Sequence, residues 1–149
     1  MPIHVEIVSQ ERIVFTEPAA DMVLIPASEG VMGVLPHHAP VLTTLGVGEL
    51  SVRKGQAEEI FAVVGGVVDV RPDKVIILAD IAESAYALNV AAAEQARADA
   101  EKLLHEGIPP EQQQEATVAL RRASLELKLS RKLQQRAPVL RIMDKNDEK

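Results

Sequence analysis

The sequence contains no cysteine and no tryptophan, and its only aromatic side chains are those of Phe15, Phe61 and Tyr86. Without cysteine the chain cannot form a disulfide, use a thiolate nucleophile or bind zinc through sulfur. So few rings argue against single-stranded nucleic-acid binding, which depends on aromatic stacking. The net charge of −6 also argues against a phosphate backbone as the partner. Nucleic acid is therefore not expected among its ligands.

Long apolar runs are missing as well. The longest uncharged stretches are broken by proline and glycine and fall short of the ~20 apolar residues that a membrane helix needs. The first six residues, MPIHVE, show no basic segment followed by an apolar one, so no signal peptide is expected. We therefore expect any membrane association to be indirect, through a partner. The chain is 47% hydrophobic, which is enough for a mostly aliphatic core.

Residues 3 to about 81 carry the pattern of short β-strands. Residues 4–9 and 48–53 alternate apolar and polar side chains, and the remaining segments are rich in Val, Ile and Leu. Turn signals at about eight- to twelve-residue spacing are typical of a β-sandwich or a closed barrel. The expected turns are Ser28-Glu29-Gly30, Lys54-Gly55-Gln56, Gly65-Gly66 and Arg71-Pro72-Asp73.

The pattern changes to helical near residue 88. Asn89 is the expected N-cap of a helix that runs to Glu106, where Gly107 and two prolines stop it. A second helix is expected from about Glu111 to Arg136, ending before Pro138. A short loop between two helices predicts an antiparallel two-helix hairpin. The expected divisions are a β domain over residues 1–87, the hairpin over 88–137 and a tail over 138–149.

The second helix has two apolar faces and a basic character. Leu120 and Leu127 share one face with two alanines, and Leu125, Leu129 and Leu133 form the other, so two packing partners are expected. Residues 118–136 carry six basic and one acidic side chain, whereas residues 1–88 carry five and twelve. The basic face is either solvated and partly neutralised by the acidic first helix, or it docks on an acidic partner.

A catalytic or metal centre is not expected. The histidines are His4, His37, His38 and His105, and none has the spacing of a metal-binding motif. The glycines around residues 30–33 and 46–48 lack the context of a phosphate-binding loop and are expected to serve turns and bulges. Glu58-Glu59 follows a turn and is expected to be solvated surface. No cofactor is expected, and an enzyme is the least favoured class.

Three segments carry a more specific signal. They are residues 28–45 (SEGVMGVLPHHAPVLTTL), followed directly by 46–50 (GVGEL), and residues 65–70 (GGVVDV) leading into 75–80 (VIILAD). Together with the domain order they closely resemble the epsilon subunit of bacterial F-type ATP synthases, with its G-x-x-G-x-L-P-x-H-x-P-L-L-T core and G-G-F-V-E-V hairpin. The β half departs from that pattern slightly, at His38 and at Val67, which replaces an aromatic residue.

The resemblance implies a fold and a role. The fold is α+β and mainly β, with an N-terminal ten-stranded β-sandwich followed by the helical hairpin. The sandwich would bind the foot of the gamma subunit and the top of the membrane c-ring, while catalysis belongs to the alpha/beta head. The hairpin would be regulatory, packing on the sandwich when folded down and blocking ATP hydrolysis when extended along gamma. The place would be the cytoplasmic face of the bacterial cell membrane.

Some bacterial members of this family bind ATP at the hairpin through an I/L-D-x-x-R-A motif. The matching stretch here begins at Leu88, but Asn89 replaces the acid and Ala92 replaces the arginine. Arg122 stands where a second-helix arginine is expected, whereas Glu126 stands where another would be. Since two charge-assisted contacts are lost, we expect weak ATP binding or none, with Leu88, Asn89 and Arg122 as the remaining candidates.

The resemblance and the charge pattern together give the candidate docking residues. They lie in the loop after the fourth expected strand and on the second helix, at Pro36, His37, His38, Arg121, Arg122, Lys128, Arg131 and Lys132. Two functional hypotheses follow. The first is a non-catalytic rotor subunit of an ATP synthase that couples rotation to synthesis and inhibits hydrolysis. The alternative is a free-standing β-sandwich adaptor whose hairpin captures other helical partners.

Overall fold

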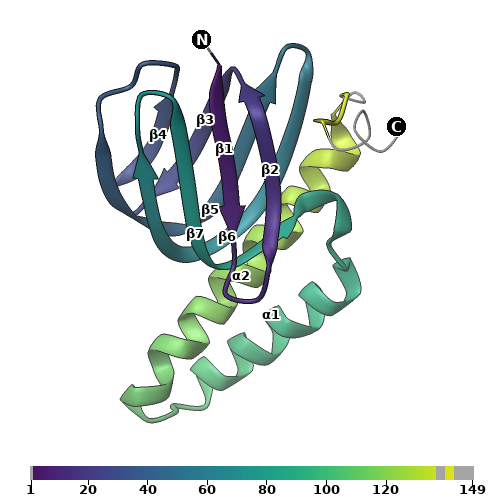
Figure 1. Ribbon diagram of the computed structural model, residues 1–149. Coiled ribbons are helices and arrows are strands. Elements are labelled where there is room, and N and C mark those ends of the chain that lie inside the picture. Colours follow the sequence, from purple (N-terminus) through teal and green to yellow (C-terminus); the bar gives the residue numbers. More distant parts are fainter. Residues whose placement is uncertain (1, 137–139, 143–149) are drawn as a thin grey trace.

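A computed structural model describes residues 2–136 and 140–142 of the chain (Figure 1). Seven strands form one sheet in the order β2-β1-β7-β6-β5-β3-β4, and all neighbours are antiparallel except the parallel pair β1 and β7. A 3-10 turn, η1 (Ala85–Ala87), connects the sheet to the helices α1 (Val90–His105) and α2 (Pro110–Gln135). The strand bounds are β1 (Ile3–Val8), β2 (Ile13–Ala20), β3 (Met22–Ala27), β4 (Gly30–Val34), β5 (Val41–Lys54), β6 (Ala57–Val70) and β7 (Lys74–Ser84).

The expected α+β fold, a sandwich followed by a hairpin, is confirmed, but the strand number is seven rather than ten. Three long strands account for the difference. Pairing between β5 and β6 runs from Val41 to Lys54 with a gap at Gly46, and pairing between β6 and β7 skips Gly65. Each of these strands bends there and continues into the second layer, so one strand does the work of two expected segments.

The predicted turn at Gly65-Gly66 is wrong, because β6 passes through both residues. Gly65 has φ +65° and Gly66 has φ +129°, which are backbone conformations that favour glycine. A Cβ on Gly66 would overlap the carbonyl oxygen of Leu78 and lie 2.8 Å from the Cα of Ala79. The glycine pair therefore serves a bend with close backbone approach inside the sheet, and not the end of a strand.

The core lies between the two layers of the bent sheet. Alternate side chains of β1, β3, β5, β6 and β7 point into it, and the rings of Phe15 and Phe61 pack with centroids 5.2 Å apart. The first part of β6 is exceptional, since every residue from Ala57 to Val64 is buried. A strand buried on both faces needs a cover outside the core, and the cover here is α2.

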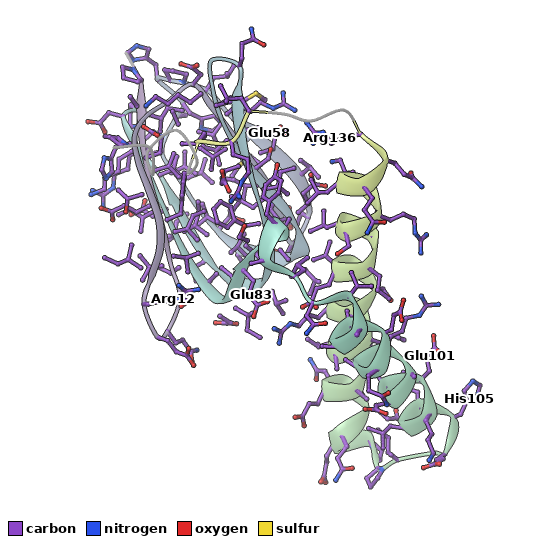
Figure 2. All side chains as sticks on the ribbon, turned by 90° about the vertical axis from the view of Figure 1, so that its right-hand side faces the viewer. Arg12, Glu58, Glu83, Glu101, His105 and Arg136 are labelled. Carbon is purple, nitrogen blue, oxygen red and sulfur yellow. The ribbon has the colours of Figure 1, made fainter. Side chains whose placement is uncertain are left out.

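The two helices begin and end close to the predicted residues. The side chain of Asn89 accepts a hydrogen bond from the backbone N–H of Ala92 at 3.1 Å, which confirms the predicted N-cap, and Gly107 has φ +73° after α1. The main packing partner of α1 is α2, and only α2 lies along the sandwich (Figure 1). Glu101 and His105 sit on the side of α1 that faces away from the sandwich (Figure 2).

We predict that Gly66→Ala destabilises the fold far more than Gly55→Ala. Both glycines have positive φ, but a Cβ at Gly55 meets nothing within 4 Å, whereas one at Gly66 overlaps backbone. The expected loss of unfolding free energy is about 1 kcal/mol for Gly55→Ala and about 3 kcal/mol or more for Gly66→Ala. Urea denaturation of both variants measures this, and equal losses would contradict the close approach at the bend.

Candidate functional site

The candidate site is built around the face of α2 that packs against the sandwich. A small apolar cluster holds it to the sheet, in which Leu129 is buried against Ile60 and Ala62 of β6 and Ala85 of η1. Leu88, Leu125 and Leu133 pack around this cluster and are partly buried. The sequence predicted two apolar faces on this helix, and the face with Leu125, Leu129 and Leu133 packs on the sandwich. Ala116, Ala123 and Leu127 are also buried, on the other apolar face of α2, and α1 is the main element that packs against this helix outside the sandwich.

Three cations of this helix and its C-cap are paired with carboxylates of the sandwich. Lys132 Nζ donates to Glu49 at 2.7 Å, Arg122 donates to Glu83 at 3.2 Å and Arg136 donates to Glu58 at 2.9 Å. Among the residues that the structure describes, no ion pair joins α1 to α2. In this conformation the acidic surface that receives the basic helix is therefore the protein's own sandwich.

The other three cations of α2 are exposed. Arg121, Lys128 and Arg131 form no ion pair with any carboxylate in the described part of the chain. The predicted set of basic docking residues is thus divided, with Arg122 and Lys132 engaged inside the molecule and these three available on its surface. Helix face alone does not explain the division, because Lys128 and Lys132 are four residues apart and line the same groove. Lys132 reaches Glu49, whereas Lys128 meets no described carboxylate.

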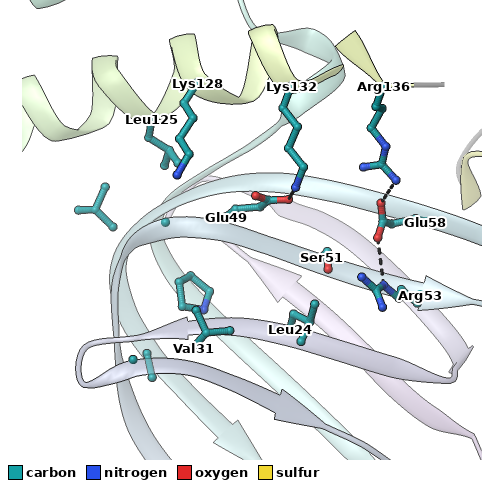
Figure 3. Close-up of a pocket in the computed structure, with 15 residues that line it drawn as sticks. Leu24, Val31, Glu49, Ser51, Arg53, Glu58, Leu125, Lys128, Lys132 and Arg136 are labelled. Atoms are coloured by element: carbon teal, nitrogen blue, oxygen red, sulfur yellow. Dashed lines mark hydrogen bonds and ion pairs between the residues drawn. The ribbon is translucent and has the colours of Figure 1, made fainter. Parts of the chain in front are cut away.

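A groove of about 660 Å³ runs between α2 and the edge formed by β3, β4 and β5 (Figure 3). Lys128 and Lys132 lie on its helix side, and Leu24, Val31 and Ser51 on its sheet side. A second hollow next to Ser28 and Val47 is bordered by Arg121 and Leu125. The lining combines aliphatic groups with cations, and its acids Glu49 and Glu58 are both ion-paired. Such a surface suits contact with a protein partner better than bond-making chemistry.

The expectation that Glu58-Glu59 is solvated surface is wrong, because Glu58 is buried and Glu59 has no exposed area. Successive strand residues point to opposite faces, so Glu58 faces α2 together with Ile60, and Glu59 faces the core together with Phe61. Glu58 accepts from Arg136 and also from Arg53 at 3.0 Å. Glu59 accepts from Arg141 at 2.7 Å.

Tyr86 completes this corner of the molecule. The guanidinium of Arg141 lies 4.0 Å from the centre of its ring, within the range of a cation–π contact. Burial raises the pKa of Tyr86 above its ordinary value, and the Glu59 carboxylate raises it further. The phenol therefore stays neutral at physiological pH, and the charge of Glu59 is met by the arginine.

The predicted loop residues Pro36, His37 and His38 lie together at one end of the sandwich, between β4 and β5. The backbone N–H of His37 donates to Pro72 O at 2.8 Å, and this residue has φ +67°. A ring nitrogen of His38 lies 2.7 Å from Ala39 O. The loop is thus held against the β6–β7 turn, far along the chain from the hairpin. His37 is exposed, and Pro36 and His38 are partly buried.

The nucleotide candidates have other partners in this conformation. Asn89 caps α1, Leu88 packs against the helix-docking cluster, and Arg122 donates to Glu126 at 2.9 Å as well as to Glu83. Nothing in the described chain brings these three residues around a shared cavity. The side chain of Glu126 accepts a hydrogen bond from Arg122, which is the only arginine among the predicted nucleotide-binding residues.

The described residues contain neither a metal-binding cluster nor a membrane-spanning helix. No group of three or more His, Asp or Glu side chains there is arranged to hold a metal ion. Neither described helix is long and apolar enough to cross a bilayer.

Sequence reasoning missed the carboxylates that receive α2. Glu49, Glu58 and Glu83 come from β5, β6 and β7, and no local motif marks any of them. The available signal was global, since the first 88 residues carry a surplus of acids and the second helix a surplus of bases. That contrast supported an acidic partner but did not identify the protein's own sandwich as one.

Known proteins with similar sequences share this architecture. The family model described as "ATP synthase, Delta/Epsilon chain, beta-sandwich domain" matches residues 2–85. The ATP synthase epsilon chain of Herpetosiphon aurantiacus is 43% identical over 131 residues, covering 88% of this chain and 96% of the relative. The epsilon chain of Moorella thermoacetica is 44% identical over 127 residues, covering 85% and 94%.

Solved structures share the fold at lower identity. A chain of the Euglena gracilis mitochondrial ATP synthase superimposes with a TM-score of 0.73 at 20% identity, covering 83% of this chain and 78% of that one. A chain of the Tetrahymena thermophila mitochondrial ATP synthase gives 0.61 at 13% identity, covering 87% and 97%. With its sandwich, its hairpin and these relatives, the chain belongs to the delta/epsilon chain family of ATP synthases, as an epsilon-type subunit.

Proposed function

We propose that the chain is a non-catalytic rotor subunit that joins the gamma subunit to the c-ring through its sandwich and restrains ATP hydrolysis through its hairpin. The observation that carries the sandwich's part is an apolar row on the outer face of the sheet. Val67 and Leu78 are paired neighbours on β6 and β7, and Val8 of β1 is the neighbour of Leu78 on the other side. On β5 the direct partner of Val67 is Thr44, and Leu42, which pairs with Asp69, borders the row from two residues away on the same face.

This row is uncovered. Leu42 is 74% exposed and Leu78 is 51% exposed, whereas α2 covers the opposite part of the sheet. An apolar row across three adjacent strands, with Leu42 beside it on a fourth, is larger than isolated surface leucines explain, and it suits a partner with its own apolar stripe. A long helical partner such as the gamma subunit of an epsilon-type complex meets that requirement.

The loop with Pro36, His37 and His38 is proposed to meet the c-ring. It is exposed at the end of the sandwich, and the hydrogen bond from His37 to Pro72 holds it in place. A fixed loop loses little conformational entropy on binding, which favours a lasting contact with a rotating ring. Through that contact the chain would reside at the cytoplasmic face of the bacterial cell membrane as a peripheral part of the complex.

The hairpin is proposed to be the movable part. Its apolar cluster on the sandwich centres on a single fully buried leucine, and two of its ion pairs are substantially exposed. When folded down, α2 keeps Arg121, Lys128 and Arg131 free of described carboxylates, and on extension Lys132 would join them. Arg122 would lose Glu83 but keep its pair with Glu126 in the same helix. An acidic surface on the catalytic head would then meet the cations in the second half of this helix.

We predict that Leu78→Asp weakens binding to the gamma subunit at least about tenfold, or about 1.4 kcal/mol, because a charge would enter an apolar interface. The matched control is Leu103→Asp on α1, where the leucine is 45% exposed but lies on the hairpin. Titration calorimetry with gamma measures both. Equal affinities for the two variants would remove the outer row from the interface, and indifference of the parent chain to gamma would favour the free-standing adaptor.

Locking the hairpin to the sandwich should abolish its inhibition. The chain has no cysteine, so Glu49→Cys with Lys132→Cys can be joined by a short thiol cross-linker without side reactions in this subunit. In the assembled ATP synthase we expect ATP hydrolysis to rise several-fold after cross-linking, because the helix can no longer reach the head. Each single-cysteine variant with the same reagent is the control, and an unchanged rate would mean that the hairpin is not inhibitory.

The hairpin should work without bound nucleotide. Asn89 and Arg122 already serve a helix cap and two carboxylates, so ATP would have to displace internal contacts. We expect a dissociation constant weaker than about 1 mM, equivalent to less than about 4 kcal/mol of binding free energy. Calorimetry on the isolated chain measures it, and sub-millimolar affinity would overturn the expectation.

A further inference from the structure

Residues 140–142, here called the clip, return from the end of α2 to the start of β6. The backbone N–H of Glu58 donates to Leu140 O at 2.8 Å, and Leu140 forms a parallel bridge with Ala57. The sequence left open whether this apolar segment anchors or frays, and its flanks at 137–139 and 143–149 lie outside the described residues. The described part meets the sheet at one isolated parallel bridge, next to the first residue of β6.

The charge of the clip is buried with its counter-ion. Arg141 donates through two nitrogens to one oxygen of Glu59, at 2.7 and 3.2 Å, and it stacks on Tyr86. Glu59 has no exposed area and faces the core side of β6. A buried carboxylate that loses its cation is strongly destabilised, whereas an exposed pair exchanges its partner for water at little cost. Arg141 is therefore a specific counter-charge and not an incidental surface contact.

Ile142 makes the clip part of the sandwich core. Its side chain is 2% exposed and belongs to the main core cluster together with Phe61 and Val63, and not to the small cluster under α2. Withdrawing it would leave a cavity and expose apolar surface. The clip thus binds by three independent kinds of contact, which are a backbone hydrogen bond, a buried ion pair and an apolar plug.

The clip restricts the hairpin by its length. Four residue steps separate Arg136, the C-cap of α2, from Leu140, and a fully extended chain of that length spans at most about 14 Å. The other end of the hairpin is joined to β7 through η1. A hairpin held at both ends cannot extend away from the sheet. We propose that the start of β6, with Glu59 and Tyr86, is a binding site for the protein's own C-terminal clip, and that the clip must leave this site before the hairpin can extend.

This inference builds on the proposed mobility of the hairpin but not on inhibition. Its test therefore uses the isolated chain and reads the position of α2 alone. Spin labels on Glu29→Cys, in the exposed β3–β4 turn, and on Gln114→Cys, near the exposed start of α2, give the distance by pulsed electron paramagnetic resonance. The cysteine-free background makes both labels specific.

We expect a single narrow distance in the labelled parent and, in Arg141→Ala, a second broad population at least tenfold larger than any in the parent. Arg131→Ala is the matched control, since it removes an exposed arginine of α2 that pairs with no described carboxylate. It should leave the distribution unchanged. If Arg141→Ala does not fold, Glu59→Gln with Arg141→Gln removes both charges together and should also release α2.

Two results would overturn the proposal. One is a parent whose hairpin is already mostly displaced, since the clip would then not restrain it. The other is a folded Arg141→Ala, or a folded double variant, with the distance distribution of the parent. Failure of the hairpin to inhibit hydrolysis in the assembled enzyme would bear on the proposed function and leave this measurement untouched.

Discussion

Strand β6 is covered on both faces from Ala57 to Val64, and the arrangement of the rest of the molecule depends on that burial. The face that carries Phe61 and Val63 lies in the sandwich core, and the face that carries Ile60 and Ala62 lies under α2. Without the hairpin, the outer face of β6 would be exposed to water, and the sandwich would carry an uncovered apolar surface there. The helix is therefore a structural cover in the folded-down state and not a loosely attached appendage.

The same strand places two neighbouring carboxylates in opposite environments. Glu58 points toward the helix and is met by Arg53 and Arg136, while Glu59 points inward and is met by Arg141. Both C-terminal arginines come from the end of α2 or just beyond it. The two adjacent carboxylates thus link the docking of α2 to the packing of the core. Their C-terminal partners, Arg136 and Arg141, are also close together along the chain.

The sequence was informative where local chemistry decides the outcome. Asn89 and Gly107 bound the first helix as predicted, and the two leucine faces of α2 followed from helical spacing alone. The burial of Glu58-Glu59 was mispredicted because it depends on long-range pairing. The resemblance implied ten strands, and the structure has seven because long strands run through their bends. In the sequence, glycines inside a bent strand have the same pattern as a turn. The local sequence of a strand also does not show that distant segments cover both of its faces. The same limit hid Glu49 and Glu83, whose partners lie far along the chain.

The energetics of the docked helix agree with the proposal that the hairpin is ordered on the sandwich and can be released from it. The pairs Lys132–Glu49 and Arg122–Glu83 are partly exposed, so each contributes at most about 1 kcal/mol and weakens with salt. Full burial of Leu129 contributes about 1.5–3 kcal/mol, and half-buried Leu125 and Leu133 add less. Because α1 and α2 pack on each other, the hairpin can stay folded when it leaves, and the entropy of its helices is not at stake. The remaining balance is a few kcal/mol, which modest contacts elsewhere can reverse.

A buried pair such as Glu59–Arg141 is of a different kind, since neither water nor salt can readily replace the missing partner. The exposed contacts therefore tune how α2 lies on the sheet, whereas the buried contact beyond its end decides whether it can leave.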